Sequence, residues 1–235
     1  MEVPFAGHPT VGTAIFLASR LDLAPNEGTA TLVLEENVGP VPVEVRFEGG
    51  APVFARFTTA VLPEHHPLAF TCGELASMVN LGEGDVCGDL QPEVVSCGLP
   101  YSIIPVRTVE ALRRAVLDMA AWNRMLADTA DPHVYLVCPA DDDEAIDVRV
   151  RMFAPGSGVP EDPATGSAAA ALGGYLAKAD GRSEGVLSWV VEQGVEVGRP
   201  STLYVEAERS GGETSAVRVG GSAVFVSEGS MTVPG

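Results

Sequence analysis

The sequence predicts an α/β (α+β) protein built from two similar halves. Three observations lead to this prediction. Short segments rich in β-branched residues alternate with helical segments, two helical segments open on nearly the same motif, and the two motifs stand about half a chain apart. The motifs are HPTVGTA at residues 8–14 and DPATGSA at residues 162–168. Their separation is too long for a solenoid repeat and suits a duplicated domain.

Strands are predicted where β-branched residues cluster between Gly and Pro. These segments are residues 30–36, 39–50, 51–60, 100–108, 133–140, 147–155, 185–194, 201–208, 215–221 and 222–229. Helices are predicted over residues 8–23, 108–127 and 162–180. A proline at the first-turn position favours the start of the first and last helices, and helical spacing of apolar residues favours the middle one.

The chain of 235 residues could form one large domain or two smaller ones. We expect a first domain over residues 1–128 and a second over residues 129–235. Strand-like sequence precedes the motif in the second half, whereas very few residues precede His8. The first domain is therefore expected to be incomplete at its start.

Composition narrows the classes of partner. The formal charge of −18 argues against a nucleic-acid partner, which needs a basic face, and against anionic membrane surfaces. We find no apolar run long enough to span a membrane and no signal-peptide pattern. The four cysteines form no CxxC pair and show no zinc-ligand spacing. Free thiols in a reducing, cytoplasmic setting are expected, with Cys97 and Cys138 buried in strands.

The repeated motif has the chemistry of an anion site. The first N–H groups of a helix are free, and the positive end of the helix dipole attracts negative charge. Glycines such as Gly12 and Gly166 allow a ligand to approach the backbone, and Thr13 or Ser167 adds a hydroxyl. If two such helix starts face a cleft, His8 and Asp162 place proton-handling groups on its two walls.

Simpler interpretations stay open at this point. Asp162 before a proline is a good helix N-cap, and His8 can be structural. The pair His65 and His66 is expected in a solvated loop, and the acidic run at residues 141–144 lacks the spacing of a calcium site. No dinucleotide fingerprint or phosphate loop is present, so neither a metal nor a cofactor is expected.

Four stretches of the chain resemble the PhzF family, named for a phenazine-biosynthesis isomerase. They are EVPFAGHPTVGTA, SCGLPY, FAPGSGVPEDPATGSAAAALGGYL and EQGVEVGRPSTLYVE, in the order in which the family has them. The resemblance implies the diaminopimelate-epimerase-like fold. In that fold two pseudo-symmetric domains each wrap a curved, mostly antiparallel sheet around a central helix, and the active site lies between them.

The resemblance also implies an activity, the cofactor-independent isomerisation of trans-2,3-dihydro-3-hydroxyanthranilate by proton transfer. His8 and Asp162 would bind the substrate's polar groups or relay protons, and Gly7, Gly166 and Ser167 would line the cleft. The family's glutamate base belongs to a segment upstream of the GHPT motif, and neither Glu2 nor Glu161 matches it. Homodimers are common in the family, and a homodimer is expected here.

Two hypotheses about function follow. The first is an isomerase or epimerase of a small carboxylate, using His8 and Asp162 with a base supplied from outside this chain. The second is a non-catalytic homologue that binds a small anion between the helix starts or serves as a partner subunit.

Overall fold

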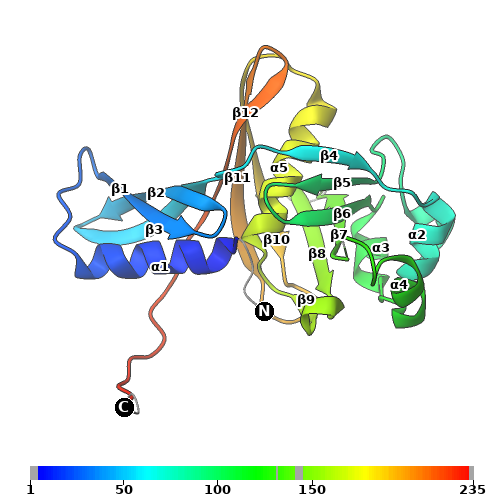
Figure 1. The fold of residues 1–235 in the computed structure, drawn as a ribbon, viewed down its shortest axis with the longest axis horizontal. Coiled ribbons are helices and arrows are strands. Elements are labelled where there is room, and N and C mark those ends of the chain that lie inside the picture. Colours follow the sequence, from blue (N-terminus) through cyan, green and yellow to red (C-terminus); the bar gives the residue numbers. More distant parts are fainter. Residues whose placement is uncertain (1–4, 131, 141–144, 233–235) are drawn as a thin grey trace.

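The computed structural model describes residues 5–130, 132–140 and 145–232, and Figure 1 shows their arrangement. Twelve strands form one sheet in the order β1-β2-β3-β12-β11-β10-β8-β7-β6-β5-β4, with β9 paired to β8. The helices are α1 (Gly7–Arg20), α2 (Cys72–Met78), α3 (Val109–Arg114), α4 (Met119–Met125) and α5 (Gly166–Asp180), with short 3₁₀ turns at Glu83–Asp85 and Pro155–Ser157. The strands are β1 (Thr29–Glu36), β2 (Gly39–Glu48), β3 (Ala51–Thr58), β4 (Glu64–Pro67), β5 (Glu93–Ser96), β6 (Pro100–Pro105), β7 (Val134–Pro139), β8 (Val148–Ala154), β9 (Val159–Asp162), β10 (Gly185–Gln193), β11 (Ser201–Ser210) and β12 (Glu213–Gly221).

The sheet wraps around two long helices. Helix α1 packs against β2 and β3, and helix α5 packs against β11, β12, β5 and β6 (Figure 1). This confirms the mixed α/β fold with central helices. The sheet runs without interruption from one helix to the other through the antiparallel pair β3–β12. The division at residues 128/129 and the pseudo-symmetry of the two halves stay predictions.

The strands under α2, α3 and α4 bury both of their faces. In β6, Ile103 faces the main core around α5, whereas its neighbour Ile104 faces a second core under the three short helices. In β7, Tyr135 and Leu136 divide in the same way. Successive residues of a strand point to opposite faces, so an uninterrupted apolar run serves two cores.

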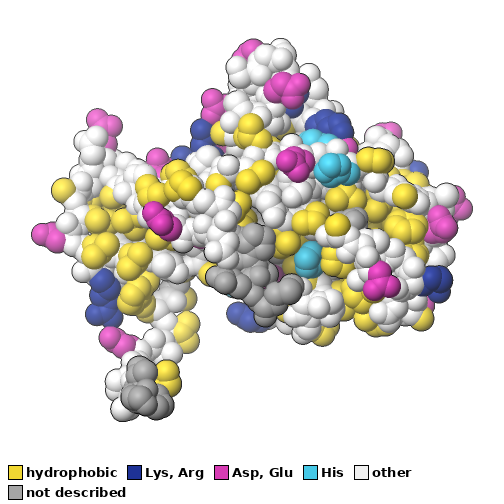
Figure 2. Space-filling view, in the orientation of Figure 1, with side chains coloured by type: hydrophobic (Ala, Val, Ile, Leu, Met, Phe, Trp, Pro, Cys, Tyr) yellow, Lys and Arg dark blue, Asp and Glu magenta, His cyan; other side chains and the backbone are white. Residues whose placement is uncertain are grey.

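Nearly all of the predicted strands are confirmed, but residues 222–229 are not a strand. Residues 222–232 lie outside regular structure, and no strand of the described chain pairs with them. Phe225 contacts Phe16 of α1, with the ring centroids 5.9 Å apart. Figure 2 shows hydrophobic side chains exposed along this tail. Val224 and Val226 are both largely exposed. A run of β-branched residues forms a strand only where a neighbouring strand offers hydrogen bonds.

The single helix predicted over residues 108–127 is also wrong, because the chain forms α3 and α4 there. Asp118 is the N-cap of α4, and its carboxylate accepts hydrogen bonds from the N–H groups of Ala120 and Ala121. Between the helices, Val116 and Asp118 donate their backbone N–H groups to the carbonyls at the end of α2. Tertiary hydrogen bonds and a strong cap thus override the helical periodicity.

The expectation of free thiols is wrong for two of the four cysteines. Cys72 and Cys87 form a disulfide with their Cα atoms 6.2 Å apart, and it joins the first residue of α2 to the loop before β5. Cys97 and Cys138 are buried and lie outside the disulfide, as predicted. With a disulfide present, the cysteines no longer argue for a reducing compartment, and cytoplasmic location stays a prediction.

Two further loop predictions differ from the structure or fall outside it. His65 and His66 lie in β4 rather than in a solvated loop, and His65 Nδ1 is 3.1 Å from a carboxylate oxygen of Glu93. The acidic run at residues 141–144 lies outside the described residues. Within the part of the chain that the structure describes, no helix has the length and apolar character needed to cross a membrane.

A buried ion pair joins β8, β9 and α3. The guanidinium of Arg151 donates to both carboxylate oxygens of Glu161, at 2.9 and 2.7 Å. Its Nη1 also donates to the carbonyls of Leu112 and Ala115 at the end of α3, at 3.0 and 2.6 Å. Arg151 therefore satisfies the free carbonyls of a helix end and holds β9 against the sheet.

We expect Arg151→Met to lower the free energy of unfolding by about 3–5 kcal/mol, because it leaves the Glu161 carboxylate buried without its partner. The matched control is Arg218→Met on β12, whose partner Glu208 is partly exposed, and it should cost less than about 1 kcal/mol. Urea unfolding followed by tryptophan fluorescence measures both variants. Equal losses in the two variants would show that Arg151 is not a buried structural ion.

Candidate active site

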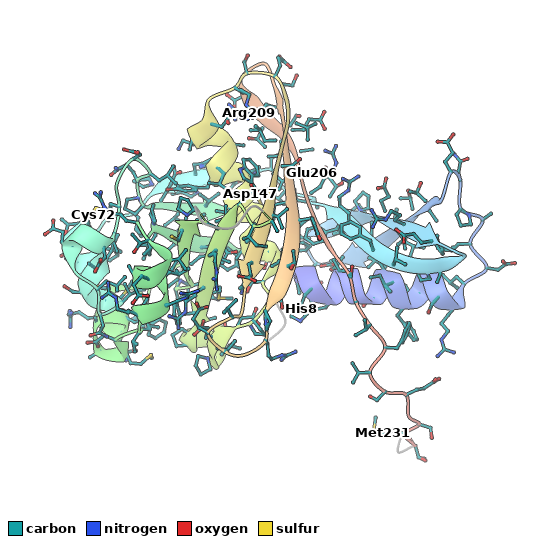
Figure 3. The ribbon with its side chains drawn as sticks, turned by 180° about the vertical axis from the view of Figure 1, so that it is seen from behind. His8, Cys72, Asp147, Glu206, Arg209 and Met231 are labelled. Carbon is teal, nitrogen blue, oxygen red and sulfur yellow. A yellow bond between two sulfur atoms is a disulfide. The ribbon has the colours of Figure 1, made fainter. Side chains whose placement is uncertain are left out.

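The first turns of α1 and α5 meet backbone to backbone. A Cβ atom added to Gly7 would lie 2.5 Å from the Cα atom of Gly166, and one added to Gly166 would lie 2.8 Å from the Cα atom of Gly7. No real side chain approaches a backbone so closely, so glycine is required on both sides. Figure 3 shows His8 at the end of α1 that abuts the long strands of the sheet.

The structural correspondence between the two helix starts differs from the sequence alignment. The aligned motifs pair Gly12 with Gly166, but Gly12 lies in the second turn of α1 and Thr13 beside it is exposed. In three dimensions Gly7 is the residue opposite Gly166. The structure therefore brings Gly7, His8, Gly166 and Ser167 together and leaves Gly12 and Thr13 away from the junction.

Neither of these two helix ends is capped by a side chain. The N-cap residues Ala6 of α1 and Thr165 of α5 make no capping hydrogen bond, and neither helix has an acidic residue in its first turn. The short helices differ, because Thr71, Thr108 and Asp118 cap α2, α3 and α4. Two positive helix ends thus converge without a capping side chain of their own.

One carboxylate does approach α1 from the sheet. The Thr10 hydroxyl lies within hydrogen-bond distance of two acceptors, a carboxylate oxygen of Glu36 in β1 and the carbonyl oxygen of Ala6, and its single hydrogen is shared between them. That contact involves a side-chain hydroxyl rather than a backbone N–H. The first N–H groups of α1 are therefore still directed at the junction with α5.

Asp162 is not the cap of α5, so the simple interpretation of the second motif is wrong. The helix begins at Gly166, and Asp162 is the last residue of β9, paired with Met152 of β8. Its half-buried carboxylate accepts a hydrogen bond of 2.6 Å from the hydroxyl of Thr165. The Asp162 carboxylate therefore lies just before α5. The Thr165 hydroxyl that donates to it would otherwise be free to cap the helix.

Tyr101 contacts a predicted site residue. Its hydroxyl lies 2.6 Å from Oγ of Ser167, at the start of α5. Burial raises the pKa of Tyr101 well above its usual range, so the phenol is neutral and can donate to Ser167. Ser167 can then donate its own hydrogen to a ligand. Tyr101 was not among the predicted site residues, although it stands in the SCGLPY motif.

A second tyrosine lies beside this pair. The Tyr135 ring is 6.3 Å from that of Tyr101, and its fully buried hydroxyl has no hydrogen-bond partner among the described residues. Burial also raises the pKa of Tyr135, and the nearby charge of Asp162 acts in the same direction. The polar groups around the start of α5 thus lie in apolar surroundings, where hydrogen bonds and charges act strongly.

A cleft of about 570 Å³ opens on the α1 side of the junction. Gly7, His8 and Gly166 line it together with the start of β11 and the end of β12. Asp162 and Ser167 are not among its lining residues, so the structure does not place His8 and Asp162 on facing walls of this one cleft. Within the described residues, no cluster of His, Cys, Asp or Glu has the arrangement of a metal site.

We expect Gly7→Ala to destabilise the protein by about 1–3 kcal/mol or more, because the new methyl group meets backbone atoms that cannot rotate away. Gly12→Ala is the control in the same helix. An added Cβ at Gly12 meets nothing within 4 Å, so this variant should gain about 0.5–1 kcal/mol from better helix propensity. Urea unfolding measures both, and a Gly7→Ala variant as stable as Gly12→Ala would contradict the close contact.

Comparisons with known proteins show the family of this chain. The family model PhzC-PhzF, described as phenazine biosynthesis-like protein, matches residues 1–229. An uncharacterized isomerase of Mesorhizobium japonicum is 40% identical over 99% of this chain and 77% of its own length. The trans-2,3-dihydro-3-hydroxyanthranilate isomerase of Pseudomonas aeruginosa is 34% identical over 97% of this chain and 74% of its own length.

A solved structure supports the fold independently. The PhzF-family phenazine biosynthesis protein of Bacillus anthracis has a TM-score of 0.84 with 24% identity, over 98% of this chain and 77% of that one. This likeness confirms the predicted fold class, and the family match confirms the resemblance read from the motifs. The chain therefore belongs to the PhzC-PhzF family.

Proposed function

We propose that this chain is a cofactor-independent isomerase that moves a proton on a small carboxylate substrate by general acid/base catalysis. The observation that supports it most is the convergence of two long helices whose N-terminal ends have no capping side chain. Each helix end carries about half a positive charge, so a carboxylate bound beside their junction is favourable to both. The hydroxyl of Ser167, held by Tyr101, would add a further donor to the bound carboxylate.

The proton-handling side chains of the proposed site are His8 and Asp162. In such an isomerisation a base takes a proton from one carbon, the double bond shifts, and an acid returns a proton to another carbon. The composition of the substrate does not change, and no electrons are exchanged with a cofactor. Imidazole and carboxylate groups are well suited to this transfer, and the low-dielectric surroundings of Asp162 strengthen its interactions.

The relatives narrow the substrate class. The Pseudomonas aeruginosa relative is named as an isomerase of a cyclic amino- and hydroxy-substituted carboxylate, and several others are named as isomerases. We propose a small carboxylate of this kind as the substrate here. The homodimer and the absence of nucleic-acid or membrane partners stay predictions. The roles of Gly12 and Thr13 in substrate binding stay predictions as well.

The first test follows deuterium from D₂O into trans-2,3-dihydro-3-hydroxyanthranilate by proton NMR. We expect the protein to catalyse incorporation at carbon, and Asp162→Asn to reduce the rate by about 10²–10⁴-fold, because an amide cannot take up the proton. The control is Asp180→Asn at the opposite end of α5, where Asp180 pairs with Arg182 on the surface. That variant should exchange deuterium as the wild type does.

Two results would contradict the proposal. If Asp162→Asn keeps the wild-type rate, Asp162 takes no part in proton transfer. If the wild-type protein is stabilised against heat by the same compound but incorporates no deuterium, the chain binds a small anion without isomerising it. That second outcome would favour the non-catalytic function.

A further inference from the structure

We propose that Gln193 and Thr165 act as positioning residues that set the orientation of the Asp162 carboxylate and keep the N-terminal end of α5 open for a ligand. The catalytic meaning of this arrangement rests on the proposed isomerase function, whereas its geometry does not. Gln193 is the last residue of β10 and is fully buried, although it is a polar side chain. Thr165, the N-cap residue of α5, is also buried.

Every polar atom of the Gln193 side chain has a partner around the start of α5. Its Nε2 donates to the backbone carbonyl of Asp162 at 2.7 Å and to Oγ1 of Thr165 at 2.8 Å. Its Oε1 accepts the backbone N–H of Thr165 at 3.2 Å. One amide therefore holds both ends of the turn that connects β9 to α5.

The direction of the hydrogen bonds is determined by chemistry. An ionised carboxylate can only accept, so the Thr165 hydroxyl must donate its hydrogen to Oδ2 of Asp162, at 2.6 Å. The oxygen of that hydroxyl is then an acceptor for the Gln193 amide. The result is a chain of donors that runs from Gln193 through Thr165 to Asp162, and it leaves the second carboxylate oxygen of Asp162 outside this chain.

The same chain explains why α5 is uncapped. A threonine at the N-cap position normally accepts a hydrogen bond from an N–H of the first turn. Here the Thr165 hydroxyl is engaged by Asp162 and Gln193 and makes no capping hydrogen bond. The first N–H groups of α5 consequently remain available to an anion at the junction with α1.

The kinetic test compares Thr165→Val with Thr165→Ser in the deuterium-exchange assay on trans-2,3-dihydro-3-hydroxyanthranilate. Valine keeps the shape and removes the donor to Asp162, whereas serine keeps the hydroxyl. We expect Thr165→Val to lower kcat by about 10²-fold, with a much smaller change in KM, because a misplaced catalytic group slows the reaction more than it weakens binding. Thr165→Ser should stay close to wild type. A Thr165→Val variant as fast as Thr165→Ser would overturn the positioning role.

A second measurement does not depend on activity or on the substrate. The chain contains two glutamines, Gln91 and Gln193. A sample labelled with [¹⁵N]glutamine therefore gives two side-chain NH₂ signals, and substituting one of the glutamines assigns both. Gln91 is exposed and serves as the internal reference. We expect the Gln193 NH₂ protons to exchange with solvent at least about 10²-fold more slowly than those of Gln91, because buried hydrogen bonds must open before exchange occurs.

The two measurements separate the two proposals. If wild type incorporates no deuterium but the Gln193 protons are protected and lose protection in Thr165→Val, the isomerase function fails and the hydrogen-bond chain stands. If the Gln193 protons exchange as fast as those of Gln91, the hydrogen-bond chain is wrong whatever the activity. Gln193→Met fills the same space without donors, and a folded Gln193→Met variant should show the same loss of kcat as Thr165→Val. If Gln193→Met does not fold, Thr165→Val alone provides the test.

Discussion

The contact between Gly7 and Gly166 is the constraint on which the rest of the structure depends. Two helices of 14 and 15 residues can meet end to end only if neither carries a side chain at the point of contact. Once they do so, each helix needs a sheet to cover its apolar face. One continuous sheet does this for both, because β3 and β12 pair across the junction.

This contact also creates an electrostatic demand. Two positive helix ends placed together repel each other unless a negative group lies near them. The peripheral helices have their own polar caps, whereas the two central helices do not. Polar residues around the start of α5 are instead engaged with one another, Thr165 with Asp162 and Tyr101 with Ser167. The proposed site thus has its hydrogen-bond donors in place without a ligand, which is what preorganised binding requires.

Two buried polar side chains near β9 depend on their hydrogen-bond partners. Gln193 and Arg151 are both buried, and without partners they would lower the stability of the folded protein. Each of them donates hydrogen bonds to both backbone and side-chain oxygens. Arg151 holds Glu161, and Gln193 holds the carbonyl of Asp162, so the last two residues of β9 are each fixed by a different strand. A short strand of four residues could not hold a carboxylate in place by its own pairing.

The sequence by itself determined the alternation of strands and helices and the family, and it predicted anion binding at the two helix starts. These features depend on local composition: β-branched runs between turns, a proline in the first turn of α1, and glycines beside hydroxyl residues. It also pointed to His8, Asp162, Gly166 and Ser167, because those residues stand in the repeated motif.

Only the tertiary structure decided which glycine faces which, where α3 ends, which cysteines pair, and that residues 222–229 have no partner strand. It alone identified Tyr101, Thr165 and Gln193 as partners of the site, because Tyr101 and Gln193 come from strands far away in the sequence. Each of these outcomes depends on contacts between segments remote along the chain, and such contacts override local propensity because they contribute hydrogen bonds and buried surface that no local pattern records.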